Sequence, residues 1–489
     1  MPVDSAGHGK PGSAHAGRQS SVPSFRASAR SALAQPALLR AVSLATSKFV
    51  SARQQTVAQT PGFEEAREQA HQIKQHVLRN LDRYLEEFAA RVEERGGQVH
   101  WAADASDACA YIAAVAAENG ARRVVKSKSM VSEEIELNQA LESRGLEVTE
   151  TDLGEYIIQL AGEKPSHLLA PALHKSRSEV GKLFAQELGM AYTDNIEQLA
   201  AAARRTLRHK FLDAELGVSG VNFGIAETGT IVILENEGNA RLTTSLPRIH
   251  VAVMGAEKLI PRLQDLVVFL KLLPRSATGQ TMTSYVSLIT GAKTHSADEG
   301  PEQLHVVILD NGRSRLLADE VQREALFCIR CGACLNICPV YRSAGGHSYG
   351  WVYQGPIGAL ITPQLSGNES ASELPFASSL CGACLEVCPV KINIPSLLLD
   401  LRSKVAVAHQ PPSSRREAML AAGFSFVMRH PAWYRLLAAV ARRLQRLALK
   451  DGAMRTSSVP LLSAWTESRD FPAMAPRSFD QIWREELRG

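Results

Sequence analysis

The sequence predicts an α/β domain with a mostly parallel sheet, followed by an all-α domain that is ferredoxin-like and holds two clusters. One observation is that strand-like and helix-like segments alternate between residues 98 and 149, the order that places helices on both faces of a parallel sheet. The other is that seven of the eight cysteines lie in two short runs between residues 328 and 388. We therefore expect four parts, at residues 1–60, 61–312, 313–408 and 409–489.

Composition limits the class of protein. The chain of 489 residues has a formal net charge of only +4, and 45% of its residues are hydrophobic. This balance gives no reason to expect nucleic-acid binding. No apolar run reaches the roughly 18 residues that span a bilayer, so we do not expect an integral membrane protein. Cysteines in cluster-like runs need a reducing compartment, and we expect a cytoplasmic location.

Residues 1–60 differ in composition from the rest of the chain. They are rich in Ser, Ala and Pro, and Asp4 is their only acidic residue against seven Lys or Arg. A segment of this kind buries too little apolar surface to order itself. The composition also resembles that of an organellar transit peptide. We favour a disordered extension with a short helix near Ala37, because nothing else marks the chain as organellar.

The elements of the α/β domain follow from hydrophobic periodicity. Helical spacing begins at Phe63 and stops at Gly96-Gly97, since paired glycines end helices. Cys109 lies in an apolar helical stretch and is expected to be a buried core thiol. Strands are expected at residues 98–102, 122–126, 146–149, 230–234 and 251–254, and helices at residues 107–119 and 133–143.

Three stretches of this domain are candidate anion sites, since arginine forks and hydroxyls suit a carboxylate or phosphate. One is the Glu-Thr-Gly-Thr turn that contains Thr228, before an apolar strand. The second runs from Arg241 through Arg248 to His250. The third and weaker one is Lys126-Ser-Lys128-Ser129, at the end of a strand, where ligands of such sheets bind. An ordinary loop with solvated charges explains each equally well. His167 and His174 have no metal-helix spacing and are expected at the surface.

The two cysteine runs indicate iron-sulfur clusters. The first run, Cys328, Cys331, Cys334 and Cys338 followed by Pro339, has the C-x2-C-x2-C-x3-C-P spacing of bacterial two-cluster ferredoxins, in which the fourth cysteine binds the other cluster. The second run, Cys381, Cys384 and Cys388, lacks the first cysteine. We therefore expect cluster one on Cys328, Cys331, Cys334 and Cys388, and cluster two on Cys338, Cys381 and Cys384.

Cluster two is one thiolate short in this assignment. It is either a 3Fe-4S cluster or a 4Fe-4S cluster completed by Ser378, by water or by a partner's ligand. Ser378 occupies the place of the missing cysteine. Structural zinc is the main rival, but zinc sites pair two C-x2-C knuckles across a longer gap, and four cysteines within eleven residues are too crowded for that.

Several of these motifs together resemble the bacterial lactate utilization protein B family. They are the stretch Ser127 to Glu134, Ala226-Glu-Thr-Gly-Thr230, the stretch Thr243 to His250, and the two cysteine runs. The likeness runs from about Ala37 to the C-terminus. It implies an α/β domain similar to the sugar-phosphate isomerase and CoA-transferase folds, and two 4Fe-4S clusters held by the seven cysteines. It also implies a part in oxidising L-lactate to pyruvate alongside two companion proteins, LutA and LutC.

The last part of the chain has a basic, amphipathic character. From Ala418 to Lys450 there are six Lys or Arg and no acidic residue, with aromatic and aliphatic residues interleaved. A helix of this kind packs on its own protein, docks on an acidic partner, or makes a peripheral contact with an anionic membrane. Residues 465–483 resemble the family's C-terminal cap.

Three classes of function agree with these features. The first is an electron-transfer subunit, which two clusters favour, since structural use or Lewis-acid catalysis needs only one. The second is an enzyme that binds substrate at an open iron of cluster two as a Lewis acid. The third is a binding protein with structural clusters. No G-x-G-x-x-G fingerprint of a nicotinamide or flavin site follows a predicted strand, so the removal of two electrons from lactate requires the clusters or a companion.

Overall fold

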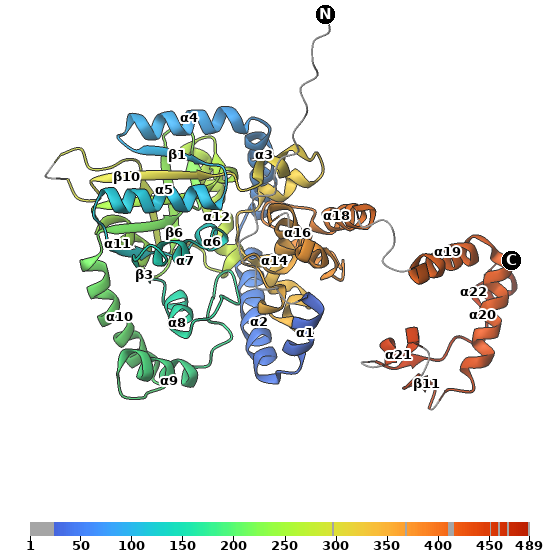
Figure 1. The fold of residues 1–489 in the computed structure, drawn as a ribbon. Coiled ribbons are helices and arrows are strands. Elements are labelled where there is room, and N and C mark those ends of the chain that lie inside the picture. The colour runs from blue at the N-terminus through green and yellow to red at the C-terminus, as the bar shows by residue number, and fades with distance from the viewer. Residues whose placement is uncertain are drawn as a thin grey trace, which may run out of the picture. The chain divides into compact units, whose positions relative to one another are not determined.

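In the computed structural model, six parallel strands form the main sheet, in the order β1-β10-β7-β4-β2-β3 (Figure 1). The structure describes residues 24–295, 298–366, 369–408, 415–449, 451–457, 460–466 and 469–487. The strands are β1 (Gln98–Ala102), β2 (Arg123–Lys126), β3 (Glu147–Glu150), β4 (Leu216–Gly220), β7 (Ile249–Gly255) and β10 (Gln303–Leu309). The mostly parallel sheet expected from the sequence is confirmed.

Both faces of this sheet are buried. In β7 and β10, Ala252 and Val306 belong to one hydrophobic cluster, while their neighbours Val251 and Val307 belong to another. Side chains alternate across a strand, so each face of the sheet has its own core. The helices of this region are α3 (Phe63–Arg79), α4 (Leu81–Glu94), α5 (Ala105–Glu118), α6 (Met130–Glu134), α7 (Leu137–Glu142), α8 (Leu153–Ala161), α9 (Arg177–Leu188), α10 (Ile196–Asp213), α11 (Asn239–Ser245) and α12 (Leu266–Ala277). α9 packs on α8 and α10 in a separate small cluster.

A smaller sheet lies beside the first, in the order β8-β5-β6-β9. Its strands are β5 (Phe223–Ile225), β6 (Thr230–Glu235), β8 (Leu259–Ile260) and β9 (Tyr285–Ile289), and the 3-10 helices η1 (Ala256–Lys258) and η2 (Leu263–Asp265) follow β7 and β8. β6 pairs antiparallel with β5 and β9. This sheet holds residues that border the candidate site described below.

Two predicted helices are each broken once. The helix expected from Phe63 to Gly96 is divided at Asn80, which caps both α3 and α4. The helix expected at residues 133–143 begins earlier, at Met130, and is divided at Glu136, whose φ of 52° is left-handed. Left-handed backbone cannot continue an α-helix, and periodicity alone does not reveal such a break.

Residues 25–58 are helical, so the expected disorder of residues 1–60 is wrong for this part. They form α1 (Phe25–Leu33) and α2 (Pro36–Ala58), and α2 contains the expected helix near Ala37. α2 contacts α12, α14 and α15 and buries Val42 and Thr46. The segment is ordered because helices distant in the sequence cover its few apolar side chains. The remainder of the predicted extension, residues 1–23, lies outside the described residues.

The region after β10 is helical and packs against the α/β region within one compact unit, residues 1–405. Figure 1 shows it in yellow and orange beside the sheet. Its elements are α13 (Arg313–Ala318), η3 (Gln322–Phe327), α14 (Ala333–Ile337), α15 (Pro339–Ala344), η4 (His347–Tyr349), α16 (Gly355–Ser366), η5 (Glu369–Phe376), α17 (Ala383–Val387) and α18 (Ile394–Ala408).

Residues 406–489 form a second compact unit. The expected basic helix is divided into α19 (Arg415–Arg429) and α20 (Pro431–Gln445), since Pro431 favours the first turn of a new helix. β11 (Ala453–Met454), α21 (Pro460–Thr466), β12 (Phe471–Pro472), α22 (Phe479–Ile482) and η6 (Trp483–Leu487) follow. Among the described residues of the whole chain, no helix is both long enough and apolar enough to cross a membrane.

Candidate functional site

The two cysteine runs fold into loops of the same conformation. Arg330 and Leu380, which precede Cys331 and Cys381, have φ values of 60° and 54°. The glycines that follow these cysteines, Gly332 and Gly382, are also left-handed, and each caps a five-residue helix, α14 or α17. Left-handed residues on both sides of a cysteine curl the backbone around it. The equal spacing in the sequence therefore corresponds to an internal structural repeat.

The sulfur atoms lie in two groups. Burial, followed by the neighbouring Cys388 and Cys328, raises the pKa of Cys331. Burial and then Cys328 raise the pKa of Cys388 to about 11. Cys388 thus lies among the cysteines of the first run, although it belongs to the second. Burial also raises the pKa of Cys334, which neighbours Cys328, Cys331, Cys384 and Cys388.

The second group combines the end of the first run with the start of the second. Burial, Cys338 and Cys381 raise the pKa of Cys384 to about 12. Burial is the first cause that raises the pKa of Cys338, and Cys381 adds to it. Cys381 is exposed, whereas the other two are buried. The structure thus brings Cys338 to the second run, while the roles of these cysteines as ligands remain predictions.

The five buried thiols of the two groups are suited to a metal cluster and poorly suited to free thiolates. The exposed Cys381 differs, because the backbone N–H of Ala383 lowers its pKa. Burial disfavours the thiolate, so a cationic group must replace the proton before the sulfurs become ligands. Backbone N–H groups of Arg330, Tyr341 and Ile392 donate to the sulfurs of Cys328, Cys338 and Cys388 at 3.4, 3.5 and 3.4 Å. Such bonds tune iron-sulfur ligands. Within the described ranges, no three His, Cys, Asp or Glu side chains are arranged to hold a single metal ion.

Ser378 takes the place that Cys328 has in the first loop. The N–H of Leu380 donates to the Ser378 hydroxyl at 3.1 Å, just as the N–H of Arg330 donates to the Cys328 sulfur at 3.4 Å. The Ser378 carbonyl also accepts a hydrogen bond from Arg402. The hydroxyl oxygen therefore occupies the position that corresponds to the missing sulfur.

A buried ionic network joins the first cysteine loop to the α/β region. Glu257, in η1 at the end of β7, pairs with Arg313 at 2.6 Å and with Arg330 at 3.3 Å. Arg313 also pairs with Glu134 at 2.8 Å. Burial opposes the charge of Glu257, but Arg313 and then Arg330 hold its pKa at about 2. The guanidinium of Arg330 lies over the ring of Tyr353, 4.6 Å from its centroid.

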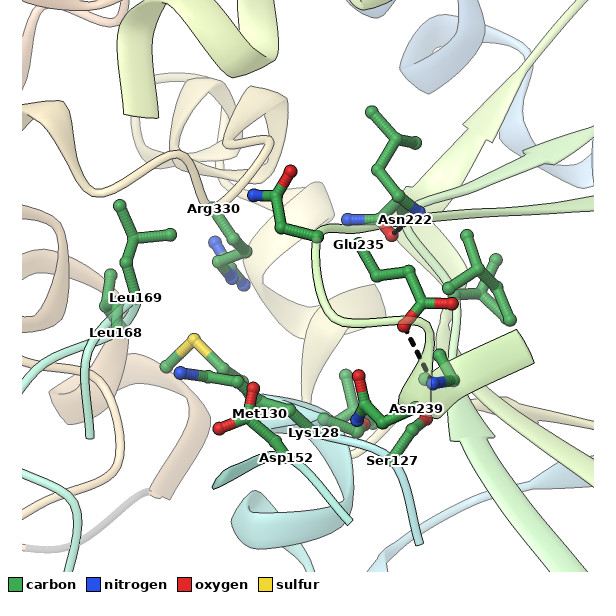
Figure 2. Close-up of a pocket in the computed structure, with 18 of the residues that line it drawn as sticks. Ser127, Lys128, Met130, Asp152, Leu168, Leu169, Asn222, Glu235, Asn239 and Arg330 are labelled. Atoms are coloured by element: carbon green, nitrogen blue, oxygen red, sulfur yellow. Dashed lines mark hydrogen bonds between the residues drawn. The ribbon is translucent and has the colours of Figure 1, made fainter. Parts of the chain in front are cut away.

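A cavity of about 290 Å³ lies where this network meets the carboxyl end of the main sheet (Figure 2). Ser127 and Lys128, after β2, and Gly220, at the end of β4, border it from the sheet, and Lys258 and Arg330 border it from η1 and the first cysteine loop. Ligands of parallel sheets bind at this edge. The weaker anion candidate of the sequence therefore lies partly in the cavity, although Lys126 instead pairs with Glu150 at 2.8 Å.

The other candidate anion residues are not brought together. Arg248 is exposed, precedes β7, and donates to the carbonyl of Asn119, so it lies at the opposite edge of the sheet. The guanidinium of Arg241 lies over the ring of Tyr285. Thr228 bonds Thr230 at 2.7 Å. None of the three borders the cavity.

The expectation that His167 lies at the surface is wrong. His167 is buried, and its ring bonds the side chain of Asn336 at 2.9 Å. Burial lowers its pKa to about 4, so it stays neutral and joins the loop after α8 to α14. Cys109 is buried, as predicted. Sequence reasoning also missed Lys258, whose only signal is its position three residues after a central strand.

Comparisons with known proteins agree over nearly the whole chain. Residues 85–309 match the LUD domain, residues 324–392 a 4Fe-4S dicluster domain, and residues 402–488 the C-terminal domain of lactate utilisation protein B. Curated proteins called lactate utilization protein B are similar to this chain. The protein of Oceanobacillus iheyensis is 44% identical over 92% of this chain and 94% of its own length. That of Bacillus licheniformis is 43% identical over 92% and 93%.

Proposed function

Because the chain belongs to the lactate utilization protein B family, we propose that it is the iron-sulfur electron-transfer component of a multi-subunit system that oxidises L-lactate to pyruvate. The companions in this proposal are LutA and LutC. Lactate loses two electrons in this reaction, and a 4Fe-4S cluster, when bound, passes one electron at a time. The chain therefore acts with its companions and not as a complete oxidase.

The observation that carries the proposal is the division of seven thiols into two adjacent groups. In the proposal, Cys328, Cys331, Cys334 and Cys388 hold one 4Fe-4S cluster, and Cys338, Cys381 and Cys384 hold the other. Cys334 is influenced by thiols of both groups, so the two sites are neighbours. Adjacent sites suit a relay of single electrons better than a purely structural role, for which one cluster is sufficient.

The chain's own residues give the two sites different access to solvent. Cys331, Cys334 and Cys388 are buried. The Arg330–Glu257 pair fixes the first cysteine loop to the α/β region. Cys381 is exposed, and Phe376, just before its loop, has 52% of its surface exposed. Electrons therefore pass to or from a companion most directly at the second site. The need to keep the thiols reduced favours a cytoplasmic location.

The second site also favours one alternative. The second site has three thiols, one of them the exposed Cys381. One iron is then free to take a substrate oxygen if Ser378 does not bind it. The chain would then be a Lewis-acid enzyme. This alternative requires activity without companions, which separates it from the electron-transfer proposal.

Anaerobic reconstitution with iron and sulfide tests the proposed cluster content. We expect about eight irons per chain, or about seven if the second site holds 3Fe-4S, and two interacting paramagnetic centres on reduction. A single four-iron centre, or stoichiometric zinc in the purified protein, would contradict the proposal.

A further inference from the structure

We propose that the cavity between the sheet and the first cysteine loop binds a small carboxylate, the 2-hydroxy acid substrate or its 2-oxo product, through Lys258, Arg330 and Lys128. This inference rests on the proposed function and names the substrate class of the chain. It concerns binding alone.

The cations that border the cavity are buried and lack complete partners. Lys258 is only 6% exposed, and within the described part of the chain its ammonium has no hydrogen-bond partner. The side chain of Arg330 is 10% exposed, and its Nε and Nη1 are also without an acceptor among the residues that the structure describes. Lys128 has its nearest carboxylate oxygen, from Glu155, at 3.7 Å, beyond hydrogen-bond distance. Glu257 is shared between Arg313 and Arg330 and is also the carboxylate that acts on Lys258. These buried cations are therefore only partly balanced and favour further negative charge.

Within the described residues, the carboxylates that border the cavity form no ion pair with these cations and instead bind backbone N–H groups. Both oxygens of Glu235 accept from the start of α11, at 2.8 and 2.7 Å. Asp152 caps α8 by accepting from two N–H groups, and Glu237 accepts from Leu153 at 3.1 Å. Glu235 thus has both oxygens engaged, and Asp152 and Glu237 each engage one, whereas Nε and Nη1 of Arg330 have no acceptor within the described residues. An anionic ligand is the complementary group.

The shape and the apolar lining favour a short-chain acid. The cavity volume of about 290 Å³ admits a small ligand with some water, but it is at the lower limit of drug-sized sites. Figure 2 shows Leu168, Leu169 and Met130 on the side of the cavity away from Glu235. In this view Arg330 lies between Leu169 and Glu235. A three-carbon acid can place its carboxylate on the cations and its methyl group against this apolar side. Arg330 also donates its backbone N–H to the Cys328 sulfur, so the ligand would lie next to the first cluster site.

The cations have one competing use, which is to balance the negative charge of a cluster on Cys328. Isothermal titration calorimetry on the anaerobic, iron-loaded full chain separates the two. We use pyruvate as the probe and pyruvamide as its uncharged counterpart. Lys258→Met and Lys128→Met test the cavity, Lys258→Arg restores the charge, and Lys210→Met removes an exposed lysine of α10 as the matched control. Iron content and circular dichroism confirm that each variant is folded and loaded.

We expect pyruvate to bind the wild-type chain, and Lys258→Met to weaken this binding at least tenfold, which corresponds to about 1.4 kcal/mol. Lys128→Met should weaken it less, Lys258→Arg should largely restore it, and Lys210→Met should leave it unchanged. Pyruvamide should bind at least tenfold more weakly than pyruvate. The inference is overturned if the wild-type chain does not bind pyruvate, if pyruvamide binds equally well, or if Lys258→Met shifts the reduction potential without changing pyruvate binding.

Failure of this inference is distinguishable from failure of the proposed function. If lactate and the companions reduce the clusters of wild-type protein, yet the lysine variants bind pyruvate normally, only the binding site is wrong. If Lys258 is needed to bind pyruvate but lactate never reduces the clusters, only the electron-transfer role is wrong.

Discussion

The guanidinium of Arg330 lies 3.3 Å from the carboxylate of Glu257, and this contact joins the first cysteine loop to the end of a central strand of the sheet. Glu257 also holds Arg313 at 2.6 Å. One buried carboxylate thus fixes two cations that belong to the helical region. The contact is one of those that join the α/β and helical regions in a single compact unit.

Removing this carboxylate should destabilise the protein. In Glu257→Gln, Arg313 keeps only Glu134 and Arg330 loses its ionic partner. Breaking a buried pair on one side costs about 3 to 5 kcal/mol, so we expect a decrease of about 3 kcal/mol in the free energy of unfolding by anaerobic chemical denaturation. Glu215→Gln is the control, because its pair with Arg123 lies at the surface and contributes at most about 1 kcal/mol. Equal effects of both substitutions would show that the Glu257 network has no special role.

Cys388 should belong to the same cluster as the first run. We expect Cys388→Ala and Cys328→Ala to alter the same paramagnetic centre, and Cys338→Ala and Cys384→Ala to alter the other. The physical reason is that Cys388 lies among the first-run thiols and Cys338 lies among the second-run thiols. EPR spectra of the four reduced variants check this. If Cys388→Ala and Cys384→Ala damage one common centre, the crossed assignment is wrong.

Ser378 should complete the second cluster, because its oxygen takes the position of a missing sulfur. We expect Ser378→Ala to convert this centre to a 3Fe-4S cluster, with its EPR signal in the oxidised protein and about one iron fewer per chain. Ser378→Cys should keep four irons and change the spectrum of the reduced centre. Ser396→Ala, at an exposed serine of α18, serves as the control. An unchanged four-iron spectrum in Ser378→Ala would leave the fourth position to water or a partner.

The dicluster domain and the parallel sheet could be predicted because both signals are local, while the ligand role of each cysteine stays a prediction. The two-residue spacing of the cysteines and the periodicity of each hydrophobic segment can be recognised within a few positions of the chain. The folding of residues 25–58 into α1 and α2 could not be predicted, since their composition is that of a disordered segment. Contacts with α12, α14, α15 and η4 supply the apolar surface against which they pack.

The cavity shows a different limit. Lys128, Lys258 and Arg330 come from three segments that no spacing rule connects, and the fold alone brings them to one edge of the sheet. Arg248 was the more prominent candidate in the sequence, but it precedes its strand and therefore lies at the opposite edge. The sequence shows which side chains suit an anion. Whether a side chain precedes or follows its strand decides the edge of the sheet at which it lies.

Buried His250 should make the protein less stable in acid. Burial, and then His305, lowers its pKa to about 3, while the unfolded chain titrates near 6.5. Between these values the unfolded state binds a proton that the folded state does not, so the free energy of unfolding decreases as the pH falls below about 6.5. His250→Asn should reduce this slope by about 1.4 kcal/mol per pH unit between pH 6.5 and 5. His209→Asn, at an exposed position of α10, should not alter the slope, and an unchanged slope in both variants would contradict the assignment.

The central claim is that the chain passes electrons from lactate only together with its companions. The most direct measurement is EPR of the anaerobic, iron-loaded chain after addition of L-lactate, with and without LutA and LutC. We predict that the isolated chain stays oxidised and turns over little lactate, and that both centres become reduced when both companions are present. Robust lactate turnover by the isolated chain, or oxidised clusters in the complete mixture, would contradict the account.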